Sequence, residues 1–256
     1  MRRHFTAVVE SDRGLERNVN QDSALIKHAF WKRGEVLLAA VCDGMGGLAD
    51  GELASGEAVH VFDEWFSKAL PYEVEEPDFS VIGAKWSSML KDLNERLNEY
   101  GKKTHELLGT TFTGILGIND SYVIVHVGDS RIYRLSSTLN QVSEDHTFVQ
   151  REVEHGRMSS KEAAVDSRRN VLTQSIGSSR KIAPQVVCGT FRPEETWLIC
   201  SDGFRHCLEE QEILEALDYQ ACPDEKAMQQ NCRKMIALNR RRGEKDDITA
   251  LLIKVD

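Results

Sequence analysis

The stretch from residue 110 to 136 constrains the fold most, because it holds β-type runs joined by very short turns. Its apolar runs are rich in β-branched and aromatic residues, and Asn119-Asp120 and Gly128-Asp129 interrupt them. Connections this short join antiparallel strands, since a parallel pair needs a crossover of roughly a dozen residues or more. The sequence therefore predicts antiparallel sheet in this block.

Helical periodicity surrounds this block. Apolar residues recur at helical spacing from Ala54 to Leu70, where Pro71 ends the pattern, and again from Ile82 to an end near Gly101. Further helices are predicted around residues 213–217 and 224–241, and further strands at 36–42, 183–188, 196–200 and 248–255. Blocks of antiparallel strands separated by paired helices predict an α+β fold in which sheets pack on each other with helices outside.

Composition narrows the class of protein. The 256 residues are expected to form one domain, residues 1–256, and the formal net charge of -9 argues against a general nucleic-acid binder. No apolar run reaches the roughly 18 residues that cross a bilayer, so we expect no membrane partner and a cytoplasmic location. The six scattered cysteines lack a C-x-x-C pair, which favours buried free thiols. With no strong exposed apolar pattern, a monomer is expected.

Acidic residues beside glycine or another small residue adjoin several predicted strands. The five segments are Asn20-Gln21-Asp22, Cys42-Asp43-Gly44, Val127-Gly128-Asp129-Ser130, Ser201-Asp202-Gly203 and Asp246-Asp247-Ile248. Each alone is ordinary turn chemistry. Gathered at one sheet end, however, carboxylates about 4 Å apart repel by about 4 kcal/mol per pair at an effective dielectric constant near 20. Such a cluster needs a cation, and oxygen ligands favour magnesium, manganese or calcium.

Three further residues fit a metal site that handles phosphate. Gly44 and Gly203 lack side chains, which lets backbone carbonyls or waters approach a metal closely. Arg17 offers a planar, bidentate phosphate ligand, although its alternative interpretation is a solvated surface arginine.

Eight motifs, in order along nearly the whole chain, carry a family resemblance. They are Gly14-x-x-Arg17-x-x-Asn20-Gln21-Asp22, Val41-Cys42-Asp43-Gly44-Met45-Gly46-Gly47, Gly109-Thr110-Thr111, Val127-Gly128-Asp129-Ser130-Arg131, Asp145-His146-Thr147, Asn170-Val171-Leu172-Thr173-Gln174-Ser175-Ile176-Gly177, Ser201-Asp202-Gly203 and Asp246-Asp247-Ile248-Thr249. Together they resemble the motifs of the metal-dependent type 2C (PPM) serine/threonine protein phosphatases in their bacterial form.

The resemblance implies a four-layer α-β-β-α sandwich with a binuclear Mn²⁺ or Mg²⁺ site at one edge of the sheets. In that scheme Asp43 bridges both metals, and the Gly44 carbonyl binds the first. Three acids surround the second metal, and they are Asp22, Asp202 and Asp246. Asp129 helps to hold a third, weaker metal. Asp247 is kept as the alternative to Asp246.

The resemblance also implies a mechanism and partners. A metal-bridging hydroxide would attack the phosphomonoester directly, without a phosphoenzyme, while Arg17 grips the phosphate; Arg17 and Asp43 are then the catalytic residues. The substrates would be phosphoserine and phosphothreonine proteins, in opposition to a bacterial serine/threonine kinase. Residues 146–180 correspond to the family's flap and are expected to influence the choice of substrate.

The position of the general acid departs from the animal members of this family. They carry a His two residues after the bridging Asp, where this sequence has Met45, as bacterial members commonly do. The expected proton donor is therefore a metal-bound water. His126, in an alternating strand, is interpreted as a packed sheet residue, and His146 as a supporting residue.

Two alternatives compete with this interpretation. Gly44-x-Gly46-x-x-Ala49 matches a short dinucleotide-binding fingerprint, but the antiparallel block that follows does not fit a doubly wound sheet. The other alternative is a catalytically silent phosphatase-like protein that only binds phosphorylated partners. Every acidic position of the motifs is intact, which favours the enzyme.

Overall fold

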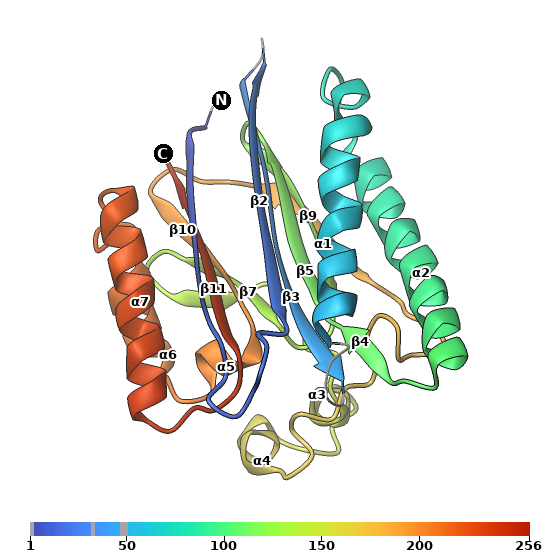
Figure 1. The fold of residues 1–256 in the computed structure, drawn as a ribbon. Helices are drawn as coiled ribbons and strands as arrows, with labels where there is room; N and C mark the ends of the chain where they lie inside the picture. The colour runs from blue at the N-terminus through green and yellow to red at the C-terminus, as the bar shows by residue number, and fades with distance from the viewer. Residues whose placement is uncertain (1–2, 32–33, 47–50) are drawn as a thin grey trace.

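Two antiparallel β-sheets form the centre of the molecule (Figure 1). The computed structural model describes residues 3–31, 34–46 and 51–256. The five-stranded sheet has the order β1-β11-β10-β7-β8, with bounds Phe5–Asp12, Ile248–Val255, Glu195–Cys200, Arg131–Leu135 and Leu139–Gln141. The six-stranded sheet has the order β2-β3-β5-β6-β9, with bounds Asp22–Trp31, Gly34–Gly46, Phe112–Ile118, Ser121–Val127 and Gln185–Thr190; β4 (Leu108–Thr110) pairs with β3. Every pairing between these strands is antiparallel, as the short turns predicted.

Helix pairs cover the outer faces of both sheets (Figure 1). On the six-stranded sheet lie α1 (Gly51–Lys68) and α2 (Phe79–Thr104), joined through the short 3-10 helix η1 (Leu70–Tyr72). On the five-stranded sheet lie α5 (Asp202–Arg205), α6 (Glu210–Leu217) and α7 (Glu225–Arg241). Two short helices, α3 (Phe148–Glu154) and α4 (Ser160–Val165), lie beyond one end of the sheets. The predicted four-layer sandwich is confirmed.

Three hydrophobic cores separate the four layers. One lies between the two sheets, and one lies between each sheet and its helices. In the core under α1 and α2, the Phe62 ring stacks on Phe112 with centroids 4.2 Å apart, and Trp86 meets Phe62 edge-on at 4.8 Å. All three rings are fully buried, so this cluster fixes α1 and α2 on the sheet.

Helix α2 extends beyond the end predicted near Gly101. Its N-cap is Asp78, whose carboxylate accepts the N–H groups of Ser80 and Val81, and its C-cap is His105, which has the left-handed conformation. A Cβ on Gly101 would lie 2.7 Å from the Glu106 carbonyl oxygen. The glycine therefore marks the place where the chain turns back over the helix, and not the last helical residue.

The first two strands of the molecule were not predicted. β1 pairs along its whole length with β11, and β2 pairs along its whole length with β3. The β2 side chains are mostly half-buried, so its sequence lacks a sustained apolar run. Both strands are stabilised by partners that are distant in sequence or that depend on the sheet register, which local periodicity does not encode.

The cysteine prediction is correct for most of the thiols. All six cysteines are free, and the buried ones are Cys42, Cys200, Cys222 and Cys232. Cys188 is exposed because it lies on β9, an edge strand whose side chains alternate between half-buried and exposed. No helix among the described residues combines the length and apolar character needed to cross a membrane.

Candidate metal centre

The topology brings the predicted acids to one end of the two sheets. The β2–β3 register places Asp22 directly opposite Asp43. Asp202 begins α5 immediately after β10, and Asp246 precedes β11. Asp129 lies in the turn between β6 and β7. Like charges opposite each other in a sheet are unfavourable, so the first pair alone calls for compensation.

Burial and neighbouring negative charges raise the pKa values of three of these carboxylates, those of Asp22, Asp43 and Asp129. Burial raises the pKa of Asp22 to about 7, and the charge of Asp202 adds to it. Burial likewise raises the pKa of Asp129 to about 7, again with a contribution from Asp202. The pKa of Asp43 is well above its usual range because of burial and of the charges of Asp22, Asp202, Asp129 and Asp246, in that order. All five acids therefore act on one shared region of negative charge.

Two buried carboxylate oxygens in this region have no hydrogen-bond partner. They are Asp22 Oδ1 and Asp202 Oδ1. The other oxygen of Asp22 accepts the Ser201 hydroxyl at 2.9 Å. Among residues 3–31, 34–46 and 51–256, no three His, Cys, Asp or Glu side chains converge on one point as a ready-made ion site. It is the shared charge and the unpaired oxygens that fit a divalent cation.

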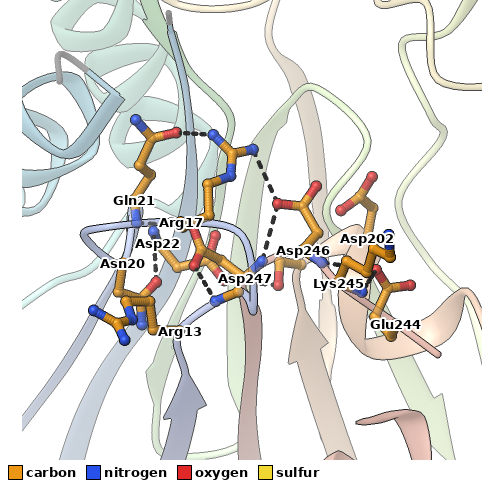
Figure 2. A network of polar contacts seen from close by, with 12 residues as sticks. Arg13, Arg17, Asn20, Gln21, Asp22, Asp202, Glu244, Lys245, Asp246 and Asp247 are labelled. Carbon is orange, nitrogen blue, oxygen red and sulfur yellow. Dashed lines mark hydrogen bonds and ion pairs between the residues drawn. The ribbon is translucent and has the colours of Figure 1, made fainter. Parts of the chain in front are cut away.

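Asp246 and Asp247 have different surroundings (Figure 2). The buried Asp247 accepts the Gly14 N–H with one oxygen, at 2.7 Å, and the Gln21 N–H with the other, at 2.9 Å. Its carboxylate thus fixes the loop between β1 and β2. The Asp246 carboxylate is more exposed and faces Arg17, with Oδ1 3.0 Å from Nη2. These contacts favour Asp246 over Asp247 as the ligand.

Arg17 lies beside the acids, and its interpretation as a freely solvated arginine is not supported. Its side chain is half-buried, and Nη1 donates to Gln21 Oε1 at 2.5 Å while Nη2 donates to Asp246 (Figure 2). The loop that carries Arg17 packs against the segment that precedes β11. A Cβ on Gly14 would lie only 2.6 Å from the Lys245 carbonyl oxygen. The guanidinium is therefore held at the edge of the acidic region.

Both predicted glycines occupy sites with no space for a side chain. A Cβ on Gly44 would collide with the carbonyl oxygens of Gly51 and Gln21, and one on Gly203 with the carbonyl oxygen of Asp247. Close packing of backbone against backbone therefore requires glycine at both positions. Two residues of the glycine-rich motifs, Gly47 and Ala49, lie outside the described residues.

The motif Gly109-Thr110-Thr111 fixes the backbone at Asp43. The Asp43 N–H donates to Thr111 Oγ1 at 2.8 Å, and the Thr111 N–H donates to the Asp43 carbonyl at 2.9 Å. The Thr110 hydroxyl donates to the same carbonyl at 3.1 Å. Three hydrogen bonds from this motif therefore fix the backbone of Asp43.

Comparison with known sequences decides the family. The family described as "Protein phosphatase 2C" matches residues 15–252. This chain belongs to the protein phosphatase 2C family. It is 30% identical over 254 residues to the serine/threonine phosphatase stp of Listeria monocytogenes, covering 98% of this chain and 96% of that protein. It is also 30% identical to PstP of Mycobacterium tuberculosis, covering 96% of this chain and 44% of that longer protein.

Solved structures agree with this assignment. The serine/threonine phosphatase of S. agalactiae superposes with a TM-score of 0.84 at 27% identity, over 99% of this chain and 100% of that one. The catalytic domain of PstP in complex with two manganese ions superposes with a TM-score of 0.76 at 27% identity, over 99% of both chains. The protein is a bacterial-type protein serine/threonine phosphatase, and the relatives support dependence on a divalent metal.

The phosphatase 2C assignment and the antiparallel sheets exclude the dinucleotide-binding alternative. Gly44 and Gly46 lie within β3, which pairs with antiparallel neighbours, whereas a dinucleotide fingerprint requires a loop after a parallel strand. The glycines of this pattern are therefore part of strand β3 of the phosphatase fold and do not form a dinucleotide-binding loop.

Two histidines of this phosphatase support the turn that carries Asp129. His126 is fully buried: its Nδ1 contacts the Thr113 hydroxyl at 2.8 Å, and its Nε2 donates to the carbonyls of Gly128 and Glu144. Burial lowers the pKa of His126 to about 3, so it is neutral. His146 Nδ1 accepts the Gly128 N–H at 3.0 Å. The interpretations of both as packed or supporting residues agree with these contacts.

Two further residues beside the acids, His206 and Glu244, were not predicted from the sequence. His206 lies one helical turn after Asp202, and its Nε2 is 3.4 Å from Asp202 Oδ2. Its Nδ1 is 3.2 Å from Glu244 Oε2. The spacing of four residues between Asp202 and His206 was visible in the sequence, but the contact with Glu244 joins residues from separate segments.

Proposed function

We propose that this phosphatase hydrolyses phosphoserine and phosphothreonine monoesters in proteins with two divalent ions, Mn²⁺ or Mg²⁺, held by the acidic cluster. Asp43, the Gly44 carbonyl, Asp22, Asp202 and Asp246 would hold the two ions, and Asp129 would help to hold a third. The observation that supports this most is the pair of buried, unpaired oxygens on Asp22 and Asp202, beside an Asp43 carboxylate whose pKa burial and nearby charges raise. Such ions, when bound, supply Lewis acidity toward phosphoryl oxygens and lower the pKa of water.

Arg17 provides the chain's own phosphate contact. Its guanidinium has a rigid fork of N–H groups that matches two phosphate oxygens. The contacts with Gln21 and Asp246 fix its direction before substrate arrives, which reduces the entropy lost on binding. Its positive charge also stabilises negative charge that develops on the equatorial oxygens in the transition state.

The side chains near the site favour hydrolysis without a phosphoenzyme. The Ser201 hydroxyl donates to Asp22 and accepts the Thr249 N–H, so it serves the structure of the site. The Cys42 thiol is fully buried, and burial raises its pKa far above neutrality. Neither residue is available as an activated nucleophile.

The flap assignment of residues 146–180 is part of the same proposal. Helices α3 and α4 border a cavity of about 730 Å³, which Arg131, Asp145, Arg169 and Arg205 help to line. Asn170 and His206 border both this cavity and the hollow beside Arg17 and Asp246. A peptide bound at the metals would therefore have space for neighbouring residues under the flap. Within the proposal, the whole chain acts as one catalytic domain, as a monomer, and opposes a serine/threonine kinase.

The test is turnover of p-nitrophenyl phosphate by protein stripped with EDTA and titrated with Mn²⁺ or Mg²⁺. An Asp202→Ala variant is the control. We expect turnover only with metal, and none in the variant. A metal-dependent rise in melting temperature without turnover would identify the catalytically silent alternative. The absence of both turnover and a metal-dependent rise in melting temperature would overturn the proposed metal centre.

A further inference from the structure

Glu244 links two parts of the chain beside the metal centre. Its Oε1 accepts the backbone N–H groups of Lys245 at 2.8 Å and Asp246 at 2.9 Å. Its Oε2 faces His206 Nδ1 at 3.2 Å. The Glu244 side chain is largely buried, at 10% exposure. One carboxylate therefore holds both the backbone of Asp246 and the ring of His206.

His206 lies between two carboxylates. Its Nδ1 faces Glu244, and its Nε2 lies 3.4 Å from Asp202 Oδ2. The Nε2 atom is buried and has no hydrogen-bond partner within bonding geometry. The His206 backbone N–H donates to the Asp202 carbonyl at 3.2 Å, which fixes the ring one turn beyond that acid. The imidazole is thus placed to restrict the rotation of the Asp202 side chain.

These contacts form a continuous chain from Asp202 through His206 and Glu244 to the backbone of Asp246. We propose that His206 is a positioning residue for the metal centre. Supported by Glu244, it orients the Asp202 carboxylate and keeps that carboxylate at a fixed position relative to Asp246. This inference rests on the proposed function, because both acids are proposed ligands. Groups that orient metal ligands typically account for about 10-fold to 100-fold in metal affinity.

The test measures Mn²⁺ binding to the full-length, EDTA-stripped protein by isothermal titration calorimetry. We expect His206→Ala to raise the Mn²⁺ dissociation constant by about 10-fold to 100-fold. The melting temperature of each variant in EDTA is compared with that of the wild type, so that a loss of Mn²⁺ affinity is separated from a loss of folding. We expect His206→Gln to recover part of the affinity, since its amide can donate to one carboxylate. The matched control is His60→Ala, at an exposed position of α1, which should bind Mn²⁺ like the wild type.

Coupling between the two residues provides a second measurement. Glu244→Gln alone should weaken Mn²⁺ binding, and the double variant with His206→Ala should bind no more weakly than the worse single variant, because both act through one chain of contacts. A His206→Ala protein that binds Mn²⁺ as tightly as the wild type, or more tightly, overturns the inference. Fully additive losses also overturn it.

The two proposals fail in distinguishable ways. If wild-type protein binds Mn²⁺ without phosphatase turnover, the proposed function fails, while a loss of affinity in His206→Ala still supports the positioning role. If the wild type is active and His206→Ala binds Mn²⁺ normally, only the positioning role fails.

Discussion

Replacing Asp22 with Asn should stabilise the metal-free protein at neutral and alkaline pH. Burial and nearby charges raise the pKa of Asp22 to about 7 in the folded state, against about 3.9 in an unfolded chain. The folded protein therefore binds more protons than the unfolded one between these values, and its free energy of unfolding falls as the pH rises through this window. Asparagine has the same shape, carries no charge and can still accept the Ser201 hydroxyl.

The size of the effect follows from the two pKa values. Between pH 5 and pH 8, ionisation of Asp22 alone should cost the folded state about 3 kcal/mol. For a protein of this length that corresponds to a fall of about 6 to 10 °C in melting temperature. Asp22→Asn avoids this term, so its advantage over the wild type in free energy of unfolding should grow by about 3 kcal/mol between pH 5 and pH 8. Asp43 and Asp129 add to the fall in both proteins.

Thermal unfolding in EDTA across pH 5 to pH 8 measures this directly. Asp92→Asn, which removes one charge from an exposed position of α2, controls for the change in net charge. Adding Mn²⁺ should narrow the difference near pH 8, because mass action stabilises the wild type by about 2.7 kcal/mol at 100 times Kd and the variant by less. Parallel curves for the wild type and Asp22→Asn throughout the pH range would refute the raised pKa of Asp22.

Three further predictions concern the rest of the site. Arg17→Lys keeps the charge but loses the two-pronged contact, so kcat/KM for p-nitrophenyl phosphate should fall by about 10-fold or more while Mn²⁺ affinity measured by calorimetry is retained. Gly203→Ala should lower the free energy of unfolding by about 1 to 3 kcal/mol through its collision with the Asp247 carbonyl. Gly56→Ala in α1, where a Cβ meets nothing, should be neutral or stabilising in the same denaturation assay. Exchanging residues 146–180 for another flap should change the relative kcat/KM of phosphopeptides with little effect on p-nitrophenyl phosphate, and equal losses on both would contradict the flap's role.

Local patterns predicted the elements with strong periodicity. The last strand was expected at residues 248–255 and is β11, Ile248–Val255. The helix expected at 224–241 is α7, Glu225–Arg241. β11 is a continuous apolar run that is buried along its whole length, and the buried residues of α7 recur at helical spacing. The strands β1 and β2 lack such spacing, and they are stabilised by pairing, β1 with the distant strand β11 and β2 with its neighbour β3.

The site shows the same division between local and long-range information. Each acidic segment was visible because aspartate beside glycine interrupts a β-type run. That Asp22 lies opposite Asp43 depends on strand register, and that His206 meets Glu244 depends on how α5 packs beside the segment before β11. Neither contact follows from spacing, since the pairing partners are chosen by the packing of whole elements.

The position of the acids between the sheets explains why the cluster persists despite its repulsion. Asp22 and Asp43 belong to the six-stranded sheet, whereas Ser201 and Asp247 adjoin strands of the five-stranded sheet. The Ser201 hydroxyl donates to Asp22, and Asp247 accepts the Gln21 N–H, so hydrogen bonds cross from one sheet to the other at this end. The large core between the sheets provides the burial that offsets the local electrostatic cost. A divalent ion bound by acids from both sheets would remove that cost and add a further connection between them.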